Sequence, residues 1–296
     1  MAKKLLALLL AVALAAVGLV SCKGKSKNGA DDNKDYTQND VILNYELVES
    51  RDAAGNLQKD EKGQQIYDRY TFDDIDSNSV IITAFEPLVV GSNLDVDGKN
   101  VVSYIRCYAP HTVAIPEKLG GKTVTAIGVG VFRNLTDLNA VVIPAGVDTI
   151  GAYAFAGCTI AGVTIPAAVK TLGEGAFHGC SKLATLTFET TALETIPQSA
   201  FMGCAALTEI TIPAGVKTVA LGAFFGCTAV TSLTVADGVE TIGELAFYKL
   251  TNLASVTLPD SLTTVGELAF YGCDPATKNT VAASYFADPS AFAPAE

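Results

Sequence analysis

The chain has 296 residues, of which 49% are hydrophobic and 17% are charged, and this composition excludes a largely disordered protein. The formal net charge is −11, and beyond the N-terminal segment no basic cluster occurs, so nucleic acid is excluded as a favourable partner. The length is enough for two modest domains that each bury a hydrophobic core.

An apolar segment near the N-terminus has the features of an export signal. Two lysines precede an apolar run at residues 5–20, which is short for a membrane span and has the order of a secretory signal. The following LVSC, residues 19–22, resembles the bacterial lipobox, and this resemblance implies cleavage before Cys22 and lipidation of its sulfur. We therefore expect a lipoprotein signal peptide at 1–21 and a protein that is exported and lipid-anchored to the bacterial outer membrane or cell surface. A plain signal peptide with an incidental cysteine is the alternative.

Two segments separate the signal from the repetitive half of the chain. Residues 22–40 are polar and glycine-containing, which predicts a flexible tether. Residues 41–118 read as a small β region whose later part caps a solenoid. The expected strands are runs of β-branched and aromatic residues at 41–48, 66–72, 80–85 and 101–108.

Few residues of the chain suggest a catalytic or metal-binding role. The segment NLDVDG at 93–98 looks like the start of a calcium loop, but Tyr104 stands where a bidentate glutamate is needed, so a hairpin turn is favoured. His111 and His178 are isolated, and we expect His178 to be a surface histidine of the repeat. No phosphate loop, nucleophile elbow or zinc motif is present in the sequence. We expect no metal, no cofactor and no catalysis; an enzyme site hidden in residues 41–118 is the alternative.

A repeat dominates the second half of the chain. The pair Ala-Phe followed by x-Gly-Cys recurs, and successive phenylalanines are 23, 22, 24, 23, 23 and 23 residues apart. Such a period predicts stacked coils, because one short coil cannot bury its apolar side alone. The phenylalanines of this predicted structural ladder are Phe132, Phe155, Phe177, Phe201, Phe224, Phe247 and Phe270.

Each repeat predicts one strand, a second short extended piece and a helical or 3₁₀ turn. Leu207, Ile210 and Ile212 alternate with polar residues as in a strand with one buried face, and Pro213 ends the strand. Gly222 then permits a turn that places the next phenylalanine inward.

Aligning the repeats gives columns of equivalent residues. Two columns are aliphatic: Leu138, Ile160, Leu183, Leu207, Val230, Leu253 and Val141, Val163, Leu186, Ile210, Leu233, Val256. Two columns contain mostly threonine: Val142, Thr164, Thr187, Thr211, Thr234, Thr257 and Thr149, Thr171, Thr195, Thr218, Thr241, Thr264. Beside them the charges alternate in sign through Asp148, Lys170, Glu194, Lys217 and Glu240, as stacked rows require. Flat threonine arrays can bind ice, but threonine is also a good strand former on a solvated face.

The cysteines follow the same repeat. One column holds five cysteines, and Leu135 and Leu250 occupy the same position in two other repeats. A position that accepts leucine is apolar, so we expect buried thiols; disulfides between repeats are the alternative, and a metal site lacks histidine partners. The column consists of Cys158, Cys180, Cys204, Cys227 and Cys273.

The segments IGAYAFAGCTIAGVTIP, IPQSAFMGCAALTEITIP and VALGAFFGCTAVTSLTV, with the lead-in IPEKLGGKTVTAIG, resemble the BspA-like class of bacterial leucine-rich repeats over residues 101–273. The resemblance implies a mainly β leucine-rich-repeat solenoid, which we place at 119–273, with a C-terminal cap at 274–296. It also implies a cell-surface role in adhesion to host matrix proteins or other bacteria.

The expected function is binding of a protein or glycan ligand by the repeat surface, with the membrane contacted through the lipid anchor alone. An envelope scaffolding lipoprotein with only bacterial partners is the alternative. Candidate ligand-binding residues are exposed aromatics at row ends, which could instead simply cover the convex side: Tyr153, Phe225, Tyr248 and Tyr271.

Overall fold

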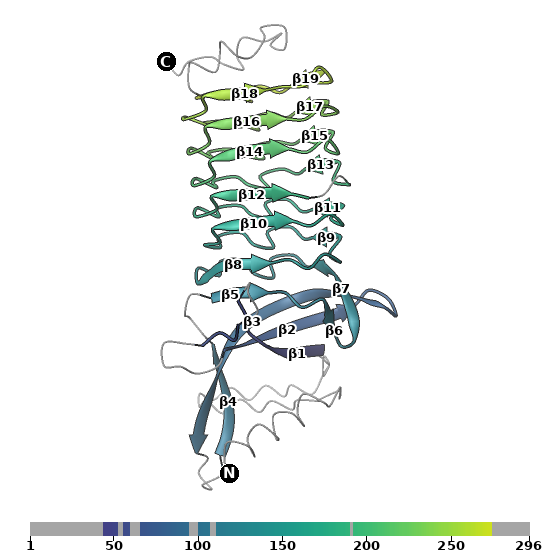
Figure 1. Cartoon of the computed structure of the whole chain (residues 1–296), viewed down its shortest axis with the longest axis vertical. Coiled ribbons are helices and arrows are strands. Elements are labelled where there is room, and N and C mark those ends of the chain that lie inside the picture. The colour runs from purple at the N-terminus through teal and green to yellow at the C-terminus, as the bar shows by residue number, and fades with distance from the viewer. Residues whose placement is uncertain are drawn as a thin grey trace, which may run out of the picture.

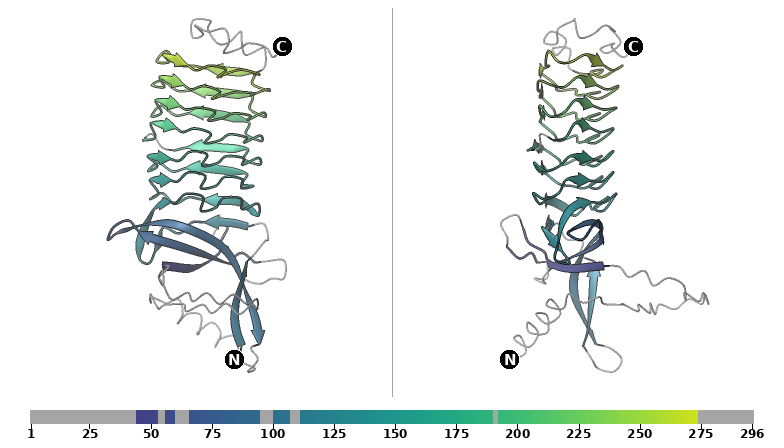
Figure 2. Two further views of the ribbon diagram at one scale, coloured as in Figure 1. Left: turned by 180° about the vertical axis from the view of Figure 1, so that it is seen from behind. Right: turned by 90° about the vertical axis from the view of Figure 1, so that its right-hand side faces the viewer.

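The computed structural model describes residues 44–52, 56–59, 66–94, 100–106, 111–189 and 192–273. These residues form strands and turns, and no helix occurs among them. The expected helical or 3₁₀ turn in each repeat is therefore wrong for the described coils, in which a hydrogen-bonded turn places the phenylalanine inward. The predicted leucine-rich-repeat solenoid is confirmed: its coils stack in file, with an N-terminal sheet at one end (Figure 1). Figure 2 shows the same stacking from two further sides.

Several expectations concern residues outside this description. They are the signal peptide, the tether with Cys22, the loop at 95–99 and the C-terminal cap at 274–296.

The N-terminal sheet is antiparallel. β2 lies between β1 and β3, and β4 pairs with the far part of β3. Leu94 pairs with Asn100, so β3 and β4 form the hairpin that was favoured over a calcium loop. The strands are β1 (Asn44–Glu49), β2 (Ile66–Asp74), β3 (Ser79–Leu94) and β4 (Asn100–Arg106).

β3 connects this sheet to the solenoid. Its first residues pair in parallel with β7 (Lys122–Ile127), which is also joined by the short β6 (Lys118–Leu119). The aromatic core continues across the same junction, because the ring of Phe85 lies 4.7 Å from that of Phe132. The division of the chain at residue 119 stays a prediction, and parallel stacking begins before it, at β5 (His111–Ala114), which pairs with β8.

Each coil contributes one longer and one two-residue strand, both parallel to those of the neighbouring coils. The longer strands after β5 are β8 (Leu138–Val142), β10 (Gly162–Ile165), β12 (Thr185–Phe188), β14 (Glu209–Ile212), β16 (Ser232–Val235) and β18 (Ser255–Thr257). The short strands are β9 (Thr149–Ile150), β11 (Thr171–Leu172), β13 (Thr195–Ile196), β15 (Thr218–Val219), β17 (Thr241–Ile242) and β19 (Thr264–Val265).

The pairing register places equivalent residues opposite one another. Ile210 pairs with Leu233, and Leu233 pairs with Val256, so the predicted aliphatic column faces inward. Thr218 and Thr241 pair in the same way on the short strands. The residues of a column therefore meet their counterparts one coil away, as the repeat predicts.

The stack is interrupted where coil length changes. Among the described strands, no ladder joins β8 to β10, β12 to β14 or β11 to β13. These breaks lie next to the coils of 22 and 24 residues, in which the regular spacing of 23 is lost. Phe188, at the end of β12, packs edge-on against Phe201 at 5.9 Å across one of the breaks.

Candidate functional site

The seven predicted ladder phenylalanines form a continuous buried stack. Neighbouring rings are 4.9 to 5.6 Å apart and nearly parallel. All seven side chains are fully buried. This stack is the interior of the solenoid, so ligands meet the columns on either side of it.

The cysteine column lies beside the rings and consists of free thiols. Each Sγ donates a hydrogen bond to a phenylalanine carbonyl of the preceding coil, as between Cys180 and Phe155 at 3.1 Å. Burial raises the pKa of Cys180 to about 12, which suppresses the thiolate that disulfide exchange requires. These thiols therefore contribute to packing and to the coil-to-coil contacts.

Turns project from the phenylalanine side of each coil and need a left-handed backbone at two positions. These positions lie two residues before and two residues after the buried phenylalanine, and glycine occupies most of them. A leucine there costs roughly 1 kcal/mol or more, because its Cβ crowds the backbone. Larger residues have φ between 53° and 60° at Asn134, Tyr153, Ser199, Leu245, Lys249 and Leu268.

Three of the four candidate aromatics meet on this side of the solenoid. Phe225, Tyr248 and Tyr271 are half-buried, and their rings stack at 4.7 and 5.2 Å with interplanar angles of 11° and 10°. Lys249 lies over the Tyr248 ring at 5.4 Å from its centroid. Within the described residues, the hydroxyls of Tyr248 and Tyr271 take part in no hydrogen bond.

Three leucines that are not among the four candidates lie in the same three turns. Leu221 is 39% exposed, and Leu245 and Leu268 are half-buried at left-handed positions. Glycine recurs in this column, so leucine in two consecutive coils was the signal that could have revealed them. We call this set the C-terminal edge: Leu221, Phe225, Leu245, Tyr248, Leu268 and Tyr271.

The fourth candidate, Tyr153, lies apart from the C-terminal edge, near the N-terminal end of the stack. Its hydroxyl donates to Glu174 Oε1 at 2.7 Å, and the Arg133 guanidinium lies 5.3 Å from its ring centroid. The hydrogen bond to Glu174 raises the pKa of Tyr153 above its usual value. The ring packs over Gly175 of the next coil, so Tyr153 connects adjacent coils.

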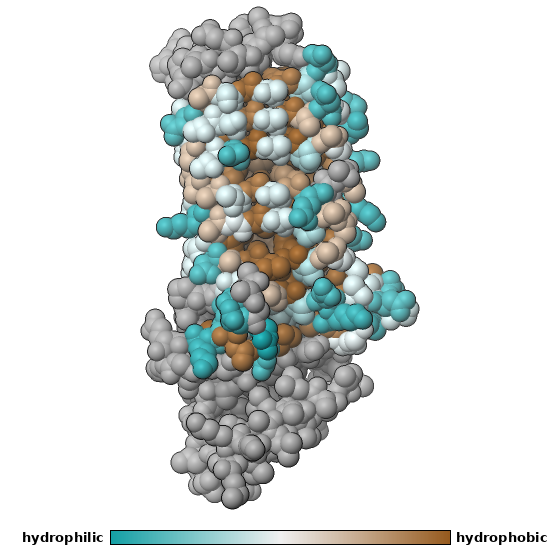
Figure 3. Space-filling model, in the orientation of Figure 1, coloured by the Kyte–Doolittle hydropathy of each residue, from teal (hydrophilic) through white to brown (hydrophobic). Residues whose placement is uncertain are grey.

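The outer face of the longer strands forms a second surface. Its central column is exposed and has small side chains, and Glu209 is the one charged residue within β8, β10, β12, β14, β16 and β18. Figure 3 shows weakly polar residues in rows on this face, with apolar residues visible between them. We call the exposed column the threonine strip: Val142, Thr164, Thr187, Thr211, Thr234 and Thr257.

A shallow depression of about 400 Å³ lies on this face over β8, β10 and β12. Val142, which is 42% exposed, lines it together with Thr164, Thr187 and Glu189. The depression joins an apolar wall to hydroxyl groups and one carboxylate, a combination that suits a side chain of a larger ligand.

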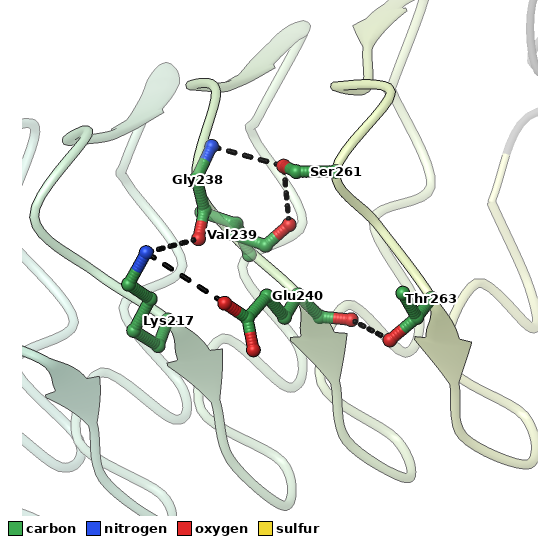
Figure 4. Close-up of polar contacts among 6 residues, drawn as sticks. All are labelled: Lys217, Gly238, Val239, Glu240, Ser261 and Thr263. Atoms are coloured by element: carbon green, nitrogen blue, oxygen red, sulfur yellow. Dashed lines mark hydrogen bonds and ion pairs between the residues drawn. The ribbon is translucent and has the colours of Figure 1, made fainter.

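A polar border that ties coils together lies just before the short strands β15, β17 and β19 (Figure 4). Lys217 Nζ donates to the Gly238 carbonyl at 3.2 Å and lies 3.7 Å from Glu240 Oε1 in the next coil. Ser261 Oγ accepts from the Gly238 N–H at 2.9 Å and donates to the Val239 carbonyl at 2.8 Å. Lys217 and Glu240 are both about half exposed, so this border orders the coils more than it stabilises them.

One histidine of the coils, His178, is half-buried, and its Nδ1 has no hydrogen-bond partner. The part of the chain that the structure describes contains no group of three or more His, Cys, Asp or Glu residues placed to hold a metal ion. It also contains no helix long and apolar enough to cross a membrane.

Comparison with one solved structure supports the fold. A leucine-rich-repeat protein of T. pallidum is 24% identical, covers 76% of this chain and 97% of its own, and superposes with a TM-score of 0.61. A leucine-rich-repeat protein from Eubacterium ventriosum is also 24% identical, with coverage of 60% and 51% and a TM-score of 0.49. No curated protein matches the chain.

The family comparison covers most of the chain. The BspA type leucine rich repeat region matches in 6 copies, at residues 106–230 and 217–293. These ranges include all coils of the solenoid, with its stacked phenylalanines and its cysteine column. The chain therefore belongs to the family of BspA-type leucine-rich-repeat proteins.

Proposed function

We propose that this chain is an exported, lipid-anchored bacterial surface protein that binds an extended protein or glycan ligand along its threonine strip and thereby promotes adhesion. The lipobox-like segment ending at Cys22 supports the anchor, and membership of the BspA-type family supports a binding role. The observation that carries the proposal is the threonine strip, a long and nearly charge-free face on a stiff stack of coils.

Physical properties of the strip favour macromolecular binding. Its side chains are short and β-branched, so fixing them against a ligand loses little rotamer entropy. Its hydroxyl groups can donate and accept, which suits peptide groups and sugar hydroxyls alike. The depression beside Val142 would hold one anchoring side chain at the N-terminal end of the strip.

A solid-phase screen tests the binding. The chain lacking residues 1–22 would be applied to immobilised host matrix proteins, to glycans and to bacterial envelope extract. We expect binding to a matrix component, and expect Thr164→Glu with Thr187→Glu to abolish it, because both residues are exposed in the depression. The matched control is Thr171→Glu with Thr264→Glu, which places the same charges on exposed positions of the short strands.

Two outcomes would overturn this assignment. Binding that survives the Thr164 and Thr187 changes would remove the strip from the site. Binding to envelope extract alone would favour a scaffolding role with bacterial partners.

The anchor has its own test. We expect a Cys22→Ala variant to lose labelling by a fatty-acid analogue, and we expect protease treatment of intact cells to remove the unaltered protein. Labelling that persists in the variant, or resistance of the unaltered protein to the protease, would contradict the proposed anchoring or exposure.

A further inference from the structure

We propose that the C-terminal edge is a second docking surface, and that its occupant is a basic amphipathic helix of a partner protein. It lies in the turns beside the buried phenylalanines, whereas the threonine strip lies on the longer strands. The two surfaces use different residues, so either proposal can fail without the other.

The first argument is the backbone conformation of two leucines. Leu245 and Leu268 occupy left-handed positions at which three other coils have glycine. Neither side chain is fully buried, so packing in the core does not account for the strain. Strained backbone conformations cluster at functional sites, and these two leucines are half-buried turn residues and not part of the core.

The second argument is that strain and aromatic stacking occur in the same turns. The Tyr248 N–H donates to the Leu245 carbonyl at 3.1 Å, and the Tyr271 N–H donates to the Leu268 carbonyl at 3.1 Å. Each of these turns therefore presents a leucine and a tyrosine together. The preceding turn contributes Phe225 to the aromatic stack and presents the exposed Leu221.

The stacking geometry favours a protein over a sugar. A sugar ring binds an aromatic side chain by lying flat on its face, but both faces of Tyr248 are covered by Phe225 and Tyr271. Outward-facing ring edges and aliphatic side chains instead suit aliphatic side chains of a partner. The tyrosine hydroxyls can accept hydrogen bonds from ammonium or guanidinium groups.

The spacing between the stacked rings favours a partner helix that lies along the solenoid axis. The stacked rings repeat at 4.7 and 5.2 Å, close to the helical pitch of about 5.4 Å, so one side chain per turn can meet one coil. An extended strand presents same-face side chains about 6.6 Å apart and falls out of register after one coil.

The negative charge near the C-terminal edge favours basic residues on the partner helix. Exposed Glu244 and Glu267 lie in the same turns, and Lys249 offsets one of them while covering part of Tyr248. The whole chain has a formal net charge of −11, which disfavours a second copy as the occupant and favours a partner rich in lysine or arginine.

A synthetic peptide provides the test. The probe is an 18-residue fluorescent peptide with leucine along one helical face and lysine on the other, titrated against the chain lacking residues 1–22. We expect saturable binding that Leu245→Gly with Leu268→Gly weakens by roughly tenfold or more. The same double variant should unfold at an equal or higher temperature, because glycine relieves the left-handed strain.

Three controls separate the surface from general electrostatic attraction. A scrambled peptide of the same composition, without an amphipathic helix, should bind weakly, and Ser199→Gly, at the equivalent position of an earlier coil, should leave binding unchanged. Glu244→Gln with Glu267→Gln should weaken binding and flatten its dependence on salt.

Each contrary result has a defined meaning. Full affinity of the leucine-to-glycine variant, or equal binding of the scrambled peptide, would overturn the proposal. Tighter binding of a strand-forming peptide of alternating leucine and lysine would exclude the helix. Self-association that Tyr248→Ala abolishes, measured by sedimentation, would make a second copy the occupant and would also overturn it.

Discussion

The solenoid coils and the N-terminal sheet both bury apolar side chains between strands, but they treat polar groups differently. Among the described residues, the buried polar or charged side chains are Ser50, Asp68 and Ser79, and all three lie in the N-terminal part of the chain. A buried charge in one coil of the stack would lie against the apolar side chains at the equivalent position of both adjacent coils, and it would destabilise both contacts. The N-terminal sheet has no such repetition and accommodates a buried carboxyl group.

Asp68 is the buried carboxyl group of the N-terminal sheet, and its burial is energetically unfavourable. It lies on the same face of β2 as Tyr70, and neither Asp68 Oδ1 nor the Tyr70 hydroxyl has a hydrogen-bond partner. Burial raises the pKa of Asp68 to about 7, an effect opposed by a hydrogen bond from Ser50. Burial and then the charge of Asp68 raise the pKa of Tyr70 well above its usual value. Among the described residues the solenoid core contains no fully buried carboxylate, whereas the raised pKa of Asp68 predicts that the stability of the sheet depends on pH.

The largest expected effect tests the solenoid core. Phe201→Ala should lower the free energy of unfolding by about 3–5 kcal/mol, because it leaves a cavity between two stacked rings. Urea denaturation followed by circular dichroism measures it. Phe225→Ala is the matched control: its ring also stacks but is half-buried, so the loss should be clearly smaller. Equal losses would contradict the distinction between core and edge.

The next effect tests the N-terminal sheet. The pKa of Asp68 is about 7 in the folded chain and 3.8 without burial, so the folded state binds the extra proton between these values. The free energy of unfolding should therefore increase as pH falls from 8 to 5 and decrease as pH rises through 7. Asp68→Asn should remove this dependence and stabilise the chain at pH 8 by on the order of 2–4 kcal/mol.

A second aspartate supplies the control for that measurement. Asp76 is exposed, and hydrogen bonds from the Asn78 backbone and from Ser79 lower its pKa. Protonation of Asp76 therefore changes the free energy of unfolding only below the range of pH 5 to 8. Asp76→Asn should leave the difference between pH 5 and pH 8 unaltered; a matching loss of pH dependence would show that Asp68 is not its source.

The smallest effect concerns the polar border of the coils. Lys217 and Glu240 are 3.7 Å apart and about half exposed, so their coupling in a double-mutant cycle should be about 0.2–1 kcal/mol and should decline with salt. Thermal denaturation of Lys217→Ala, Glu240→Ala and the double variant gives this value. A coupling above that range would mean that surface charges, and not the buried columns, hold these coils in register.

The same contrast explains how much the sequence could predict. Seven repeats specify each column several times, so the aliphatic and threonine columns could be aligned before their strand pairing was known. The predicted strands of the N-terminal region also formed, but the parallel pairing of β3 with β7 depends on contacts between distant segments. No local pattern encodes such a pairing.

Prediction of the binding surfaces was less complete. Selecting exposed aromatics found Phe225, Tyr248 and Tyr271, which lie together, and Tyr153, which lies apart from them and connects coils. Leu245 and Leu268 were missed because leucine in a leucine-rich repeat suggests core. The glycine found at this position in three other coils was a signal in the sequence, and the backbone angle shows what that glycine provides.

The interruption beside the 24-residue coil has a mechanical consequence. The free energy of unfolding of such a stack is the sum of one contribution from each coil and one from each contact between adjacent coils. A tensile load along the axis therefore opens the weakest contact between adjacent coils first. No strand ladder joins β12 to β14 or β11 to β13 in the described residues, which leaves the turn contacts, such as the Phe177 N–H to the Ala200 carbonyl at 2.8 Å, to transmit the force. If the chain is anchored and loaded as proposed, we expect this junction to yield before the coils unravel.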